Sequence, residues 1–79
     1  MTVTVTDLKE FIRSTLNLRD ISAEAAMGTV RGWDSLNQVN LIVSLEARYG
    51  LEIPPDMIGE LVSVASIIDH FRSEGLLQV

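Results

Sequence analysis

A long helical segment limits what this chain can fold into. It runs from about Ser35 to Tyr49, with Asp34 suited to cap its start and Gly50 suited to end it. Its apolar residues fall into two stripes that face partly away from each other. Because one helix face cannot cover both, the helix is either buried nearly all round or meets something outside the domain. The first stripe holds Leu41, Ile42, Leu45 and Tyr49, and the second holds Leu36, Val39 and Val43.

The part of the chain before this helix is less regular. Apolar residues at helical spacing predict a first helix from about Asp7 to Leu16, with Thr6 as its cap. Residues 1–5 are expected to form a loose leader, because a short strand-like pattern has no strand to pair with. A long loop follows, from about residue 17 to Trp33. We expect it to pack against the helices, to be anchored by its tryptophan and to contain one helical turn at Ala23–Met27.

Two more helices are predicted after the long one. The Pro54-Pro55 pair breaks the chain, so Met57–Leu61 can form only a short helix. Ser63 caps a last helix, which Gly75 ends and whose apolar residues recur at i, i+3, i+4 and i+7: Val64, Ile67, Ile68 and Phe71. The sequence therefore predicts one all-α domain over residues 1–79, a four-helix bundle with three longer helices, one short helix and a long first loop.

The composition narrows the possible partners. The chain has 79 residues and a formal net charge of -5, from 11 acidic and 6 basic side chains. Repulsion from phosphate groups therefore disfavours nucleic acid and anionic membrane as partners. Because there is no cysteine, any thiol chemistry needs an imported thiol. With no apolar run of membrane-spanning length and no secretory signal pattern, we expect a cytoplasmic location. We also expect a monomer.

Ser35 raises the question of catalysis. It does not lie in a G-x-S-x-G elbow, and the one histidine, His70, is expected to point outward from the last helix into solvent. A serine without a base, an oxyanion hole or a cleft is a poor nucleophile. The carboxylates are spread singly, and the chain has neither a calcium loop nor a phosphate-binding glycine loop. We therefore expect no catalytic residue and no metal site.

The position of Ser35 suits modification by another enzyme instead. As the first residue of a helix, it is expected to expose its hydroxyl at the positive end of the helix dipole. A phosphodiester joined there would find free backbone N–H groups. A plain Asp-Ser helix start is the common alternative, and the triplet Asp34-Ser35-Leu36 alone does not decide between the two.

The sequence around the triplet is more specific. Between about Gly32 and Phe71 it contains Asp34-Ser35-Leu36, Val39, Leu41, Leu45-Glu46, Tyr49, Glu52-Ile53-Pro54, Val64 and Ile68-Asp69. In this combination the chain resembles the acyl carrier protein family. The resemblance implies that Ser35 receives 4′-phosphopantetheine from coenzyme A through a separate phosphopantetheinyl transferase, with Asp34 and Leu36 aiding recognition. The thiol of that arm would carry acyl or aminoacyl groups as thioesters, which agrees with the absence of cysteine.

The resemblance also implies partner enzymes that activate or process the cargo. Leu36, Val39, Val43, Glu46 and Met57 match positions from which such carriers meet their partners. For the three aliphatic residues, ordinary core is the alternative.

The chain departs from the strongly acidic second helix of many fatty acid carriers. Asn37 and Asn40 stand where acidic residues are usual, and Ala47-Arg48 stands where a Glu pair often lies. Residues 34–50 carry a net charge of only -1, from two acidic side chains against one arginine. Weaker charge shifts specificity toward apolar contact. We therefore favour a dedicated polyketide, nonribosomal peptide or related pathway. A housekeeping fatty acid carrier and an unmodified helical interaction domain remain the alternatives.

Overall fold

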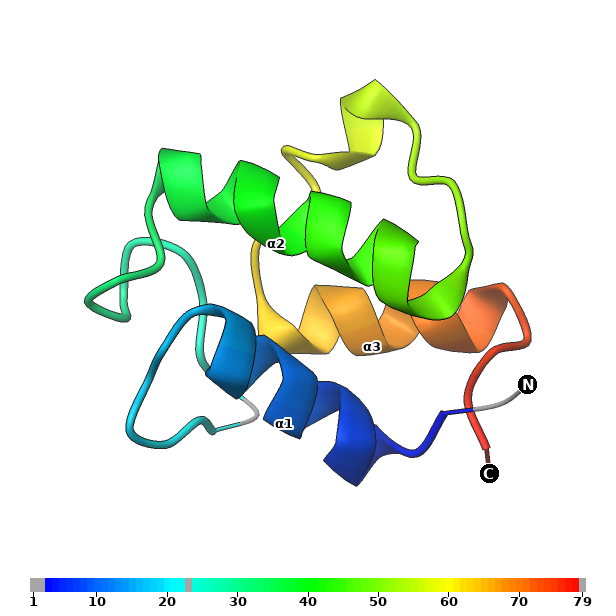
Figure 1. Ribbon diagram of the computed structural model, residues 1–79, viewed down its shortest axis with the longest axis horizontal. Coiled ribbons are helices and arrows are strands. Elements are labelled where there is room, and N and C mark those ends of the chain that lie inside the picture. The colour runs from blue at the N-terminus through cyan, green and yellow to red at the C-terminus, as the bar shows by residue number, and fades with distance from the viewer. Residues whose placement is uncertain (1–2, 23, 79) are drawn as a thin grey trace.

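The computed structural model describes residues 3–22 and 24–78 (Figure 1). Within these residues the elements are α1 (Val5–Thr15), α2 (Ser35–Tyr49), the 3₁₀ helix η1 (Pro55–Met57) and α3 (Val64–Ser73). Extended pairing in this part of the chain is limited to isolated bridges. The predicted all-α bundle, with three longer helices, one short helix and a long first loop, is confirmed.

α1 begins earlier than the sequence predicts. Thr4, rather than Thr6, caps the helix, and its Oγ1 accepts a hydrogen bond from the Asp7 N–H at 3.0 Å. Leu8 and Ile12 are fully buried, as the apolar spacing predicts. The predicted cap is wrong because the two threonines offer equally suitable side chains, and the spacing of apolar residues does not choose between them.

The segment before α1 is held in place, which corrects the expectation of a loose leader at residues 1–5. Val3 is buried, its N–H donates to the Leu76 carbonyl at 2.8 Å, and its carbonyl accepts from the Gln78 N–H at 2.8 Å. Residues 1 and 2 lie outside the described part of the chain. These bonds place the start of the described chain beside the segment that follows α3 (Figure 1).

α2 has the predicted boundaries. Asp34 caps its start, and its Oδ1 accepts a hydrogen bond from the Asn37 N–H at 2.9 Å. At the other end Gly50 adopts a left-handed conformation, with a φ of 64°, which L side chains rarely take. Both signals act within one helical turn, so the ends of α2 could be predicted from the sequence alone.

The first apolar stripe of α2, here called the inner stripe, consists of Leu41, Ile42, Leu45 and Tyr49. The core lies where it meets α1 and α3 (Figure 1). Tyr49 packs edge-on against two phenylalanine rings, with centroid distances of 5.6 Å to Phe11 and 5.4 Å to Phe71. Such edge-to-face pairs stabilise a core beyond the area that they bury. The aliphatic members of the stripe, Leu41, Ile42 and Leu45, are at most 1% exposed.

The loop between α1 and α2 is joined to the start of α3. The Met27 N–H donates to the Val62 carbonyl at 2.7 Å, and the Val64 N–H donates to the Ala25 carbonyl at 2.9 Å. Residues 24–27 therefore do not form the helical turn expected at Ala23–Met27. The Ala25 carbonyl and the Met27 N–H pair with the distant segment, and the local backbone bonds of this stretch reach outside it, from the Ala25 N–H to the Ser22 carbonyl and from the Thr29 and Val30 N–H groups to the Ala26 carbonyl. Residue 23 lies outside the described residues.

The two later helices agree with the sequence to different degrees. The helix predicted at Met57–Leu61 is wrong in its bounds, since η1 covers Pro55–Met57 and only a hydrogen-bonded turn continues it. Ser63 caps α3 as predicted and forms a reciprocal capping box with Ser66. No helix of the described chain has the length and apolar character needed to cross a membrane.

Candidate functional site

Ser35 is the first residue of α2, and its side chain is exposed. The carboxylate of the preceding Asp34 accepts the Asn37 N–H, which leaves the N–H groups of Ser35 and Leu36 at the positive end of the helix without an intrahelical acceptor. Apart from the Asp34 cap, whose carboxylate is bound to the Asn37 N–H, the first turn of α2 contains no acidic residue. An anion joined to the Ser35 hydroxyl would therefore lie in a favourable field, close to free donors. The site fits a phosphodiester.

Asn37 fixes the turn that leads into the site. Its Nδ2 donates to the Gly32 carbonyl at 2.7 Å, and Gly32 has a left-handed φ of 96°. An aspartate at position 37 would have no amide hydrogen to donate. The asparagine that replaces the usual acid thus has a structural role at the entrance to α2, which sequence reasoning did not find.

Gln38 is the buried polar side chain of the described residues, at 3% exposure. Its Oε1 accepts a hydrogen bond from the Trp33 indole at 2.7 Å, and its Nε2 donates to the carbonyls of Ile58 at 2.9 Å and Leu61 at 2.6 Å. The prediction that Trp33 anchors the loop is confirmed, since the ring is 1% exposed. Gln38 itself was missed. The available signal was its spacing, because it occupies the inner stripe three residues before Leu41.

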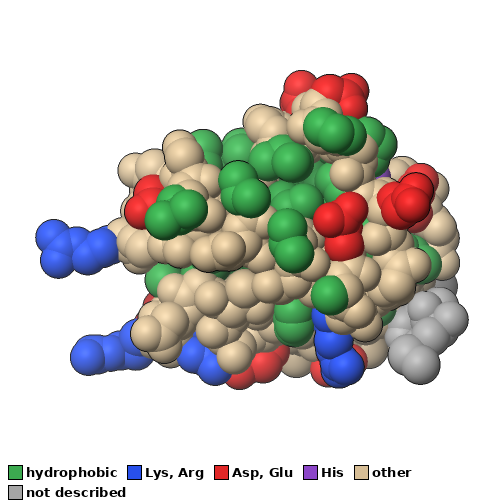
Figure 2. All heavy atoms as spheres, turned by 45° about the horizontal axis from the view of Figure 1, so that its top comes forward, with side chains coloured by type: hydrophobic (Ala, Val, Ile, Leu, Met, Phe, Trp, Pro, Cys, Tyr) green, Lys and Arg blue, Asp and Glu red, His purple; other side chains and the backbone are tan. Residues whose placement is uncertain are grey.

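The second stripe of α2 faces outward. Leu36, Val39 and Val43 are 73%, 46% and 56% exposed, which rules out ordinary core for these residues. Figure 2 shows hydrophobic side chains gathered over the face that carries α2 and η1. We call these three residues the outer stripe. An exposed apolar stripe of this kind is typical of a surface that meets a partner.

The other two predicted contact residues, Glu46 and Met57, are less exposed than the outer stripe. Glu46 is half-buried, and its Oε2 accepts a hydrogen bond from the Ile53 N–H at 2.8 Å. Met57 is also half-buried and packs against the core. Both therefore have structural roles, and their contact with partners stays a prediction.

His70 is not the outward, solvated residue that the sequence suggests. It is half-buried, and its Nε2 is buried without a hydrogen-bond partner. The reason is that the segment around Met57 and Leu61 lies over this side of α3, and together they line a hollow of about 410 Å³. His70 belongs to the later turns of α3, away from the start of α2 (Figure 1), so the structure does not bring it to Ser35.

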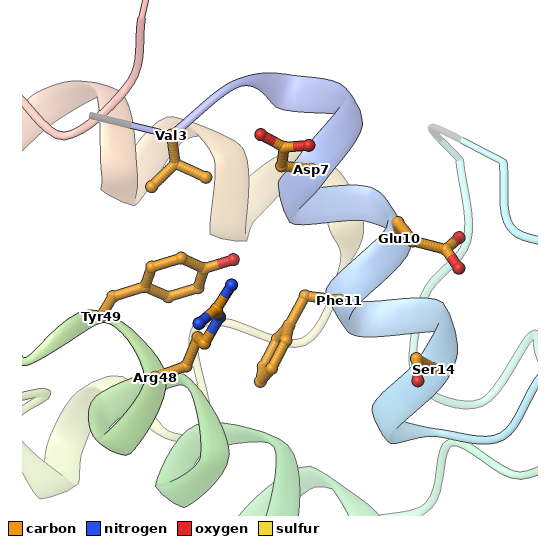
Figure 3. A pocket seen from close by; sticks show the side chains of 7 residues that line it. All are labelled: Val3, Asp7, Glu10, Phe11, Ser14, Arg48 and Tyr49. Carbon is orange, nitrogen blue, oxygen red and sulfur yellow. The ribbon is translucent and has the colours of Figure 1, made fainter. Parts of the chain in front are cut away.

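Another hollow, of about 480 Å³, lies between α1 and the end of α2 (Figure 3). The side chains of Arg48 and Tyr49 approach it from α2, and that of Phe11 approaches it from α1. It lies at the opposite end of α2 from Ser35. The described residues contain no group of three or more side chains able to hold a metal ion. Neither hollow is lined by Ser35, so its exposed hydroxyl does not lie in an enclosed reaction site.

Two comparisons with known proteins bear on this site. The family model described as a phosphopantetheine attachment site matches residues 6–71. The chain is similar to the acyl carrier protein of Helicobacter acinonychis, with 31% identity over 72 residues that cover 89% of this chain and 92% of the relative. It is also similar to the mitochondrial acyl carrier protein of Saccharomyces cerevisiae, with 32% identity over 68 residues that cover 84% of this chain and 54% of the relative.

Proposed function

The chain belongs to the acyl carrier protein family, and we propose that Ser35 is the residue that bears its 4′-phosphopantetheine. Proteins of this family are non-catalytic carriers, and this group is their covalent cofactor. Its thiol, on which cargo is carried as a thioester, supplies the chemistry that a chain without cysteine lacks. The observation that carries the proposal is the exposed Ser35 hydroxyl beside the free N–H groups at the start of α2.

Attachment needs an external enzyme, because the carboxylate beside Ser35, that of Asp34, is bound to the Asn37 N–H as the cap of α2, and His70 lies away from Ser35 (Figure 1). The Ser35 oxygen attacks the phosphorus of coenzyme A that bears the pantetheine. The Oγ–P bond forms, the pyrophosphate bond breaks, and adenosine 3′,5′-bisphosphate leaves. The hydroxyl proton passes to a base of the phosphopantetheinyl transferase. We propose that Asp34 and the exposed Leu36 contribute to recognition by this enzyme, since they flank the reacting oxygen.

The attachment is tested by mass. The protein is incubated with coenzyme A and a transferase of broad specificity, and the intact mass is measured. We expect a gain of one phosphopantetheine in the wild type and in Ser44→Ala, a control on the same helix, and no gain in Ser35→Ala. A gain in Ser35→Ala would overturn the site. The absence of any gain in the wild type would favour the unmodified interaction domain.

For the pathway, we propose dedicated polyketide, nonribosomal peptide or related biosynthesis. The support is the weak charge of residues 34–50 and the apolar outer stripe, which together favour docking by apolar contact. A housekeeping fatty acid carrier is the second candidate, because the similar bacterial proteins bear the general name acyl carrier protein. A cytoplasmic location and a monomeric state stay predictions.

The pathway proposal is tested with the loaded protein. Turnover by fatty acid elongation enzymes is compared with loading by activating enzymes encoded near this chain's gene. We expect efficient loading by the latter and a weak dependence of its rate on salt, because screening acts on charge and not on apolar contact. Efficient turnover by the elongation enzymes, falling steeply with salt, would support the housekeeping alternative.

A further inference from the structure

The hydrogen bonds of Gln38 join three segments close to the attachment residue. Gln38 lies one helical turn after Ser35 and contacts the loop through Trp33. It also contacts the segment after η1 through the carbonyls of Ile58 and Leu61. Together with the packing of Ile58 and Leu61 in the core, these hydrogen bonds hold this segment against the start of α2, next to the point where the arm would leave the protein.

Every hydrogen-bond donor of the two side chains in this network is paired. Both hydrogens of the Gln38 amide are donated, its oxygen accepts, and the single donor of the Trp33 ring is paired. Gln38 and Trp33 are 3% and 1% exposed, so water cannot replace a lost partner without entering the core. Breaking this network leaves buried polar groups unpaired, which is costly.

We propose that the network of Trp33 and Gln38 is a latch that keeps apolar cargo on the Ser35 arm outside the bundle. The inference rests on the proposed attachment at Ser35. Apolar chains on a flexible arm gain free energy by leaving water. To enter the bundle beside α2, however, such a chain has to break the hydrogen bonds from Gln38 to the carbonyls of Ile58 and Leu61. Those carbonyls would then be buried against the apolar chain without a donor, which costs free energy. The cargo therefore stays accessible to partner enzymes.

Accessibility is measured by the cleavage of the thioester with hydroxylamine. The transferase loads acetyl and octanoyl groups from their coenzyme A esters, and intact mass verifies loading before each assay. In the wild type we expect the octanoyl and acetyl forms to be cleaved at the same relative rates as free octanoyl- and acetyl-pantetheine. In Gln38→Met, which keeps the side-chain length but cannot form the network, we expect several-fold slower cleavage of the octanoyl form alone. Asn40→Met, at an exposed position of α2, is the matched control and should behave as the wild type.

Two outcomes overturn the latch. One is several-fold protection of the octanoyl form in the wild type. The other is equal cleavage of both forms in a folded Gln38→Met. If that variant does not fold, Gln38→Leu replaces it under the same criteria, because it also removes both amide donors and puts an apolar side chain in their place. A failure of the proposed attachment is seen separately, as the absence of any mass gain before hydroxylamine is added.

Discussion

The two stripes of α2 have similar composition and opposite surroundings. The inner residues Leu41, Ile42 and Leu45 are at most 1% exposed, whereas the outer residues are 46% to 73% exposed. These residues of the two stripes are all aliphatic and lie on the same helix. The difference shows that an apolar pattern identifies residues that favour burial but does not identify what buries them. For the inner stripe it is α1 and α3, and for the outer stripe we propose a partner enzyme.

The largest expected effect separates the stripes by stability. Leu45→Ala removes a fully buried side chain, so we expect it to lower the free energy of unfolding by about 2–5 kcal/mol. Val43→Ala, at an exposed position of the same helix, should change it by less than about 0.5 kcal/mol. Urea unfolding measures both. A similar loss in the two variants would show that the outer stripe is packed in solution and would contradict the comparison.

The next effect separates the stripes by binding. Leu36→Asp places a charge in the outer stripe, and we expect the kcat/KM of a partner enzyme to fall about tenfold or more, while the unfolding free energy stays nearly constant. Ala65→Asp, which adds the same charge at an exposed position of α3, is the control. Equal losses in the two variants would mean that general charge, and not the outer stripe, governs docking.

A smaller effect distinguishes two roles of Asp34. Asp34→Ala removes the cap of α2, so we expect a loss of about 1 kcal/mol in the free energy of unfolding. Asp34→Asn keeps a capping side chain and should retain most of the stability. If the carboxylate also serves recognition, modification by the transferase will slow in both variants. Normal modification of Asp34→Asn would limit the residue to its capping role.

The parts of the fold that could be predicted from the sequence are those set by local signals. Asp34 and Gly50 bound α2 because a side-chain cap and a left-handed glycine act within one helical turn. The division of α2 into two stripes also follows from helical geometry. The wrong cap of α1 shows the limit of such signals, since Thr4 and Thr6 are locally equivalent.

What the sequence did not indicate depends on contacts between distant segments. The spacing of Gln38 indicates that it faces inward, but its partners are carbonyls some twenty residues later, which no local pattern indicates. His70 was expected in solvent because the segment that covers it belongs to another part of the chain. At the candidate site, the exposed position of Ser35 could be predicted because a helix start is a local feature, and its proposed role came from the resemblance of the wider sequence. The turn held by Asn37 could not, because it needs the Gly32 carbonyl in place.

The smallest expected effect concerns the end of the inner stripe, where burial is incomplete. Burial raises the pKa of the Tyr49 hydroxyl, with the nearby Arg48 opposing the shift, so the folded state disfavours the tyrosinate. Above the usual tyrosine pKa of about 10, the unfolded chain releases this proton more readily, and the free energy of unfolding falls as pH rises. Tyr49→Phe should therefore show a shallower decrease than the wild type in urea unfolding between about pH 9 and about pH 11. Because Tyr49 is the only tyrosine of the chain, the difference between the two slopes reports on this residue. Equal slopes would show that its hydroxyl is exposed to solvent, and that the inner stripe ends before Tyr49 on this side of α2.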